Sequence, residues 1–271
     1  MERSPSGVYH CALSGKGALS RLAEYGGCLR FLTLGSLKVR YRRSVLGFAW
    51  SLLYPLMSMA VLTVVFSRVF ADLDHYALYV IVGVLAWGFF SLSCLQAMDS
   101  LISGAAVMRK VYVPSAVFPL SVVGANMINL LLSLSVLPLV MMVLGAGPGF
   151  HPMWLLAALL ALAAFTAGVA LALAALNLFF RDIRYFFEGL LLIWFYATPV
   201  VYPASVVPAD WSPLLWLNPF HWLIALMRAA LWNGAPPPAG TVAICLAFAT
   251  VTLVAGWRLF VGLERRFYLY I

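Results

Sequence analysis

Long apolar runs decide the fold of this chain, and the clearest is YALYVIVGVLAWGFFSLSCLQAM at 76–98. About 20 consecutive, mostly apolar residues are enough for an α-helix to cross the hydrocarbon core of a bilayer. The run at 76–98 contains no Asp, Glu, Lys or Arg. It therefore predicts a membrane-spanning helix.

Five further segments have the same character. They lie at about 46–70, 115–144, 152–177, 186–202 and 240–262. Hydrophobic residues make up 64% of the 271 residues and charged residues 10%, against roughly 45–50% and about 25% in soluble domains. The mean hydropathy is +0.99, and a soluble globule could not bury so much apolar surface. We expect an all-α integral membrane protein with six transmembrane helices, and the composition excludes disordered and disulfide-rich secreted chains.

Basic residues are distributed unevenly between the two sides that six spans define. One side would carry Arg3, Lys16, Arg21, Arg30, Lys38, Arg40, Arg42, Arg43, Arg109, Lys110, Arg181, Arg184, Arg265 and Arg266, out of 17 Lys and Arg residues in all. The positive-inside rule makes this side cytoplasmic, and both termini with it. Topology and contact with anionic membrane lipids account for most of the net charge of +8, so the charge does not indicate a nucleic-acid partner.

Residues of about 18–44 are too polar to span the membrane. Leu34, Leu37, Tyr41 and Val45 share one helical face, which predicts an amphipathic helix at the membrane surface, either an anchor alone or part of a gate. We expect a cytoplasmic segment at 1–45, a six-helix domain at 46–263 and a cytoplasmic tail at 264–271. The first fifteen residues lack an apolar run, so we expect no cleavable signal peptide.

The segment 203–238 reads PASVVPADWSPLLWLNPFHWLIALMRAALWNGAPPP. Its prolines break it, and only a stretch near 219–232 has helical character. Non-helical backbone at membrane depth is tolerated where protein or a water-filled cavity surrounds it. We therefore expect a re-entrant or interfacial segment on the external side, with simple interface anchoring as the alternative explanation for its tryptophans.

The residues of an enzyme or a coupled carrier are missing from the sequence. None of the nine acidic residues lies in the middle of a predicted span, whereas proton- and sodium-coupled carriers need such carboxylates. SGKG at 14–17 lacks the first glycine and the Ser or Thr of a phosphate-binding loop. The four cysteines, at 11, 28, 94 and 245, lack metal-ligand spacing. We expect reduced cysteines, no enzymatic activity and no cofactor in this chain.

Aromatic side chains are frequent inside the predicted spans. Such side chains offer a sliding surface to sugar rings, although each could instead pack the core or face lipid. The candidate channel residues are Trp50, Tyr54, Phe66, Trp87, Phe90, Trp194, Tyr196 and Tyr202.

The connection DSLISGAAVMRKVYVPSAVFP at 99–119 predicts a short amphipathic helix that exposes Arg109, Lys110 and Tyr112. Such a helix could dock into a cytoplasmic partner. A plain connecting loop is the alternative.

Three segments together resemble one family. They are KVRYRRSVLGFAWSLLYPLMSM at 38–59, NLFFRDIRYFFEGLLLIWFYATPVVYP at 177–203 and LNPFHWLIALMRAALW at 217–232. In this order they resemble the ABC-2 type polysaccharide export permeases, membrane subunits that export O-antigen, teichoic acid and some capsular chains. The resemblance covers the chain from about residue 30 onward.

The resemblance implies a type V exporter-like permease in the bacterial inner membrane. It implies a homodimer bound to two ABC ATPase subunits, which would bind the ATP and Mg²⁺, and a substrate polysaccharide linked to undecaprenyl diphosphate. It also implies a gate helix around Arg40, Arg42 and Arg43, which would meet the lipid diphosphate, a coupling helix at about 100–113 and external gate helices at 203–232. The alternatives are an exporter of teichoic acid or capsular glycan, an exporter of a small molecule or drug, and a structural or lipid-scrambling protein.

Overall fold

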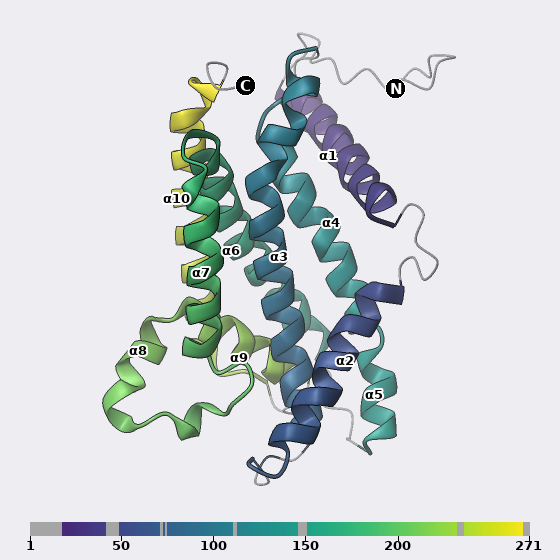
Figure 1. Ribbon diagram of the computed structural model, residues 1–271, viewed down its shortest axis with the longest axis vertical. Helices are drawn as coiled ribbons and strands as arrows, with labels where there is room; N and C mark the ends of the chain where they lie inside the picture. The colour runs from purple at the N-terminus through teal and green to yellow at the C-terminus, as the bar shows by residue number, and fades with distance from the viewer. Residues whose placement is uncertain are drawn as a thin grey trace.

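The computed structural model describes residues 18–41, 49–70, 73, 75–110, 113–145, 151–231 and 236–267, without the side chains at 18–25, 39–41 and 51. Arg42, Arg43 and Tyr112 therefore lie outside the described residues, as does the side chain of Arg40. All regular structure in the described ranges is helical (Figure 1). The predicted all-α class is confirmed.

Ten α-helices and two 3-10 turns follow one another in the described residues. They are α1 (Ala18–Tyr41), α2 (Ala49–Phe66), α3 (Tyr76–Met108), α4 (Val117–Leu134), α5 (Leu137–Val143), α6 (Pro152–Phe179), α7 (Asp182–Ala197), the turns Ala204–Val206 and Ala209–Trp211, α8 (Ser212–Leu217), α9 (Pro219–Leu231) and α10 (Ala239–Glu264). α1 and the C-terminal end of α10 lie at one end of the molecule, and α8 and α9 lie at the other (Figure 1).

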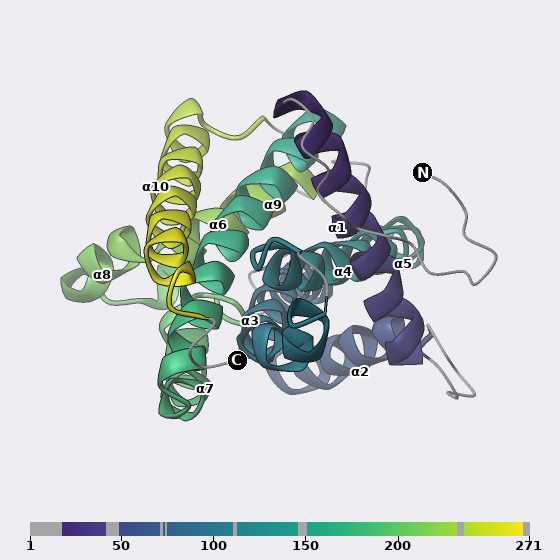
Figure 2. The ribbon, with the colours of Figure 1, turned by 90° about the horizontal axis from the view of Figure 1, so that it is seen from above.

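α3 is the central helix of the assembly. It packs against α2 and α4 on one side and against α6, α7 and α9 on the other (Figure 2). Its residues are buried along almost the whole length, from Tyr76 to Gly104. A helix that is hydrophobic all round is typical of such a surrounded position.

Four helices of the described residues are long and apolar enough to cross a bilayer. They are α3, α4 with α5 (Val117–Val143), α6 and α10, and a fifth crossing results if the pair 209–217 and 219–231, bent by 87°, counts as one span. α2 and α7 represent the first and fifth predicted spans but are shorter. The 16 residues of α7 rise about 24 Å, against a hydrocarbon core of about 30 Å. The count of six spans therefore stays a prediction.

Two glycines bring α6 and α10 into backbone contact. A Cβ atom on Gly256 of α10 would lie 2.0 Å from the carbonyl oxygen of Gly168 in α6. Small residues let membrane helices approach closely and pack well. This contact therefore holds α10 against α6, although most side chains of α10 face away from the core.

Two sequence-based expectations differ from the structure. The stretch at about 100–113 is not a separate helix, because α3 continues to Met108. No proline precedes Pro114 in this stretch, and Gly104 packs against the ring of Phe118 instead of breaking the helix. Cys94 and Cys245 are free and buried, but Cys28 is disulfide-bonded. The expected reduced state is wrong there, because sequence spacing does not show which thiols approach one another.

Candidate functional site

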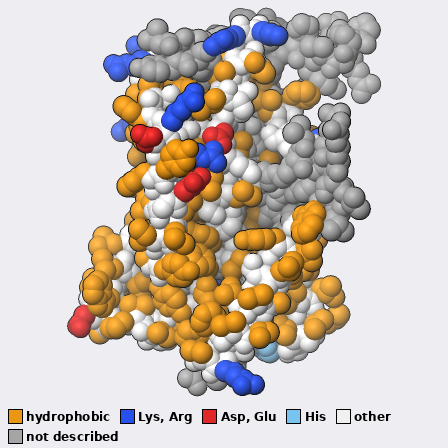
Figure 3. Space-filling view, viewed as in Figure 1, with side chains coloured by type: hydrophobic (Ala, Val, Ile, Leu, Met, Phe, Trp, Pro, Cys, Tyr) orange, Lys and Arg blue, Asp and Glu red, His pale blue; other side chains and the backbone are white. Residues whose placement is uncertain are grey.

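Charged side chains gather at one end of the molecule, which we call the basic end. Figure 3 shows Lys and Arg side chains mainly near the end formed by α1 and the C-terminal end of α10, with further basic charge at the opposite end, where Arg68 is exposed, and hydrophobic side chains over much of the remaining surface. The exposed basic residues of these helices and their neighbours include Arg30, Lys38, Arg109, Lys110, Arg181, Arg258, Arg265 and Arg266. A belt of apolar surface with positive charge at one end is typical of a membrane protein with that end in the cytoplasm.

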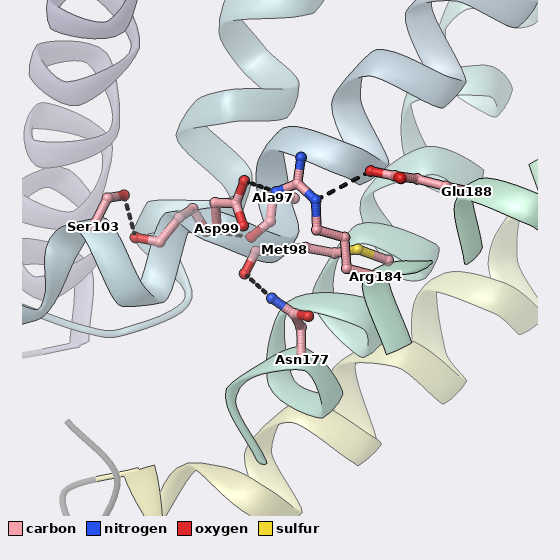
Figure 4. Close-up of polar contacts among 8 residues, drawn as sticks. Ala97, Met98, Asp99, Ser103, Asn177, Arg184 and Glu188 are labelled. Carbon is pink, nitrogen blue, oxygen red and sulfur yellow. Dashed lines mark hydrogen bonds and ion pairs between the residues drawn. The ribbon is translucent and has the colours of Figure 1, made fainter. Parts of the chain in front are cut away.

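An ion-pair cluster joins α3 and α7 toward the basic end. Arg184 of α7 forms an ion pair with Asp99 of α3, and its Nε lies 3.1 Å from Oε1 of Glu188 (Figure 4). Asn177 of α6 donates a hydrogen bond of 3.0 Å to the backbone oxygen of Met98. These contacts tie α3, α6 and α7 together toward the basic end. The charged side chains are partly exposed, so water weakens their attraction.

The coupling residues predicted from the sequence lie beyond this cluster. Arg109 and Lys110 are exposed in the turn that ends α3, and Tyr112 lies outside the described residues. Ser115 donates a hydrogen bond to a carboxylate oxygen of Glu264 at the end of α10. The residues that lead into α4 are therefore connected to the end of α10 on the same side of the molecule.

An arginine that the sequence analysis did not single out organises the opposite end. Arg228 of α9 is only 7% exposed. Its guanidinium donates hydrogen bonds to the backbone oxygens of Pro199 (2.9 Å), Val200 (2.7 Å) and Tyr79 (3.2 Å). The same group lies over the ring of Tyr79, 3.4 Å from its centre. We call Arg228, Tyr76, Tyr79 and the backbone of 199–202 the arginine–carbonyl cluster.

Four consecutive carbonyl groups after α7 accept hydrogen bonds in this cluster. Besides the two bonds from Arg228, the hydroxyl of Tyr76 donates to Val201 (2.8 Å) and that of Tyr79 to Tyr202 (2.9 Å). Unpaired backbone groups are costly away from water, and a non-helical segment at membrane depth must find partners inside the protein. Side chains of α3 and α9 supply those partners here.

Asn218 holds the bend between α8 and α9 against the end of α7. Its side-chain oxygen accepts from Nε1 of Trp194 and from the backbone N–H of Phe220, both at 3.0 Å. Its Nδ2 donates to Oγ1 of Thr198 at 2.8 Å. The predicted broken character of the segment that ends at α9 is confirmed, and its polar groups explain how the break is stabilised.

The candidate channel aromatics fall into two groups. Trp87 and Phe90 are buried in an aromatic cluster with Phe165, Trp194 and Phe220, whose ring centres lie 4.9–6.4 Å apart. Phe90 has no exposed surface, which favours the alternative that it packs the protomer core. By contrast, the side chains of Trp50, Tyr54, Phe66, Tyr196 and Tyr202 lie at the surface or are partly exposed, and Trp194 of the aromatic cluster is also partly exposed.

One feature of the sequence could have pointed to Arg228. It is a charged residue within the otherwise apolar run LIALMRAAL at 223–231. Ionisable side chains in membrane segments are rare and pair with other groups inside the protein. The identity of its partners, about 30 and 150 residues away along the chain, could not be read from the sequence.

Comparison with known proteins identifies a family and named relatives that this chain resembles. The family model of the ABC-2 type transporter matches residues 28–232. The O-antigen export system permease protein RfbA of Myxococcus xanthus is 34% identical over 239 residues, which cover 87% of this chain and 91% of that protein. A protein of the same name from Klebsiella pneumoniae is 30% identical over 205 residues, or 75% and 79% of the two chains. The family match includes both the ion-pair cluster and the arginine–carbonyl cluster.

Proposed function

The chain belongs to the ABC-2 type transporter family, and from this premise we propose that it is the membrane subunit of an ATP-driven exporter of O-antigen. The observation that carries the proposal is the 34% identity, over 87% of this chain, to a protein named as an O-antigen export permease. The substrate would be the polysaccharide linked to undecaprenyl diphosphate. The chain would conduct it outward across the bacterial inner membrane.

The energy for export would come from a separate ATPase subunit. The sequence lacks a phosphate-binding loop, and two copies of the partner would bind ATP and Mg²⁺. Arg109 and Lys110, in the turn that ends α3, and Tyr112 would contact this partner. The exposure of Arg109 and Lys110 supports this role.

Six spans and two cytoplasmic termini complete the proposed topology. The basic end would face the cytoplasm, and the arginine–carbonyl cluster would lie toward the outside. α2 and α7 would span the membrane together with the residues that flank them. Two copies of the chain would enclose the channel, and the exposed aromatic residues Trp50 and Tyr54 on α2 and Tyr196 on α7 would face the polymer or the second copy.

Arg40, near the end of α1, together with Arg42 and Arg43, would bind the lipid diphosphate. A guanidinium group matches the geometry of phosphate oxygens and stays charged at all physiological pH values. Arg42→Glu is expected to stop export while assembly with the partner continues. Normal export by this variant would remove the role of the arginines in substrate binding.

A deletion strain tests the proposed function. Cells without the chain are fractionated, and the sugars on each side of the inner membrane are analysed, with a strain complemented by the intact gene as the control. We expect lipid-linked polymer to accumulate in the cytoplasm and surface polysaccharide to decrease. The sugars of the trapped polymer would identify the substrate.

The opposite outcome is equally informative. Unchanged surface polysaccharide and no trapped polymer, in a strain without a second exporter, would contradict export of a lipid-linked glycan. Trapped teichoic acid or capsular glycan would keep the transport mechanism and replace the substrate.

A further inference from the structure

We propose that Arg228 is a positioning residue that fixes the non-helical segment 199–202 to α3, so that this segment and α3 move as one body. The proposal deepens the proposed function. It rests on that function only in assigning the movement to export of the polymer. The contacts that carry it are those of the arginine–carbonyl cluster.

The charge of Arg228 depends on these contacts. Among the described residues no carboxylate forms an ion pair with Arg228. Backbone oxygens and the ring of Tyr79 stabilise its positive charge instead. A buried cation without such partners is strongly unfavourable. Movement of the segment away from α3 would strand both the cation and the oxygens of Pro199 and Val200. The segment and the arginine therefore stay together.

Close packing strengthens the connection to α3. Gly83 faces the segment, and a Cβ atom there would lie 2.7 Å from the oxygen of Val200 and 2.9 Å from Nη2 of Arg228. Such distances are shorter than real carbon contacts, so only glycine leaves room for the guanidinium to reach Val200. α3 thus contributes the space beside Gly83, the hydroxyl donors of Tyr76 and Tyr79, and the aromatic face of Tyr79.

α3 is a suitable element to carry movement between the two ends of the molecule. It runs unbroken for 33 residues, a length of about 50 Å. At its other end lie the ion-pair cluster and the exposed Arg109 and Lys110. A displacement imposed there by a partner would reach the segment 199–202 through a single rigid helix, provided that the cluster around Arg228 holds.

The matched substitutions Gly83→Ala and Gly88→Ala test the proposal. Both add one methyl group to α3, but a Cβ atom on Gly88 meets nothing within 4 Å. The full chain would be assembled with its ATPase partner in lipid nanodiscs, and hydrogen exchange of backbone amides would be compared between 198–217 and the α6–α10 contact. Arg228→Met and Tyr79→Phe provide independent changes to the same cluster.

We expect Gly83→Ala to speed amide exchange at 198–217 by roughly tenfold, as the loss of about one buried hydrogen bond would do. Exchange at the α6–α10 contact should stay unchanged, and Gly88→Ala should match the unmodified chain at both places. ATP hydrolysis should continue while export falls. A merely structural role would instead raise exchange in every helix.

Two results would overturn the proposal. One is equal exchange at 198–217 in the Gly83→Ala and Gly88→Ala variants, and the other is a uniform rise in both regions. Tyr79→Phe, which removes one hydroxyl only, keeps the test decisive if Arg228→Met does not assemble. The exchange pattern is independent of the transported substance, so failure of the proposed function would appear separately, as absence of export by the unmodified chain.

Discussion

An arginine from another helix packs against α3 toward each of its ends, and the two arginines have opposite surroundings. Arg184 is partly exposed and faces two carboxylates, Asp99 and Glu188. Arg228 is buried and faces backbone oxygens and an aromatic ring. Exposed ion pairs contribute about 0–1 kcal/mol to stability, whereas a buried charge and its partners are costly to separate. The ion pairs of Arg184 are therefore expected to contribute less to stability than the contacts of Arg228.

The largest expected effect follows from the same substitution at both ends. Arg228→Met leaves the oxygen of Val200 without its donor and that of Pro199 with only the Tyr79 hydroxyl at 3.4 Å, and should lower the free energy of unfolding by about 2–4 kcal/mol. Arg184→Met, the matched control, should lower it by less than about 1 kcal/mol. Unfolding of the purified chain in mixed micelles, followed by circular dichroism, measures both. Equal losses in the two variants would contradict the comparison.

A smaller effect is expected when only one hydroxyl of the buried cluster is removed. Tyr79→Phe keeps the ring beside Arg228 but loses the donor to Tyr202, which should cost about 0.5–2 kcal/mol. The control is Tyr185→Phe, because Tyr185 is 72% exposed. The same unfolding measurement applies. A loss as large as that of Arg228→Met would mean that the hydroxyl, and not the guanidinium, holds the segment.

The smallest effect is expected at the ion-pair cluster, where it should depend on salt. Arg184→Asp brings like charges together and should cost about 1 kcal/mol at low ionic strength, less in about 1 M salt. The double variant Asp99→Arg with Arg184→Asp restores opposite charges and should recover most of the loss. Unfolding at two salt concentrations checks both points. No recovery in the double variant would show that the helices are joined there by packing alone.

Much of the fold follows from hydrophobic patterning in the sequence. The long apolar runs predict both ends of α6 and α10 within about two residues, and the start of α3 at Tyr76, because length and apolar character alone decide whether a helix can span a membrane. The continuation of α3 to Met108 was not predicted. The polar residues after Met98 were interpreted as a connection, although nothing in them ends a helix.

The sites were harder to predict than the helices. Phe90 and Tyr54 both lie in apolar runs, yet one is fully buried and the other is 71% exposed. A run that is apolar all round does not show which face meets protein and which meets lipid. The partners of Arg228 could not be predicted either, because they are backbone oxygens, which every residue possesses. The roles of Arg40, Arg42, Arg43 and Tyr112 remain predictions.

Transport in inverted membrane vesicles tests the central claim most directly. Vesicles that contain this chain and its ATPase partner are supplied with lipid-linked O-antigen on the outer, formerly cytoplasmic face, and the fraction protected from an added glycosidase is measured with and without ATP. The account predicts protection that requires ATP and disappears in vesicles without the chain. Protection that is the same with and without ATP, or with and without the chain, would contradict it.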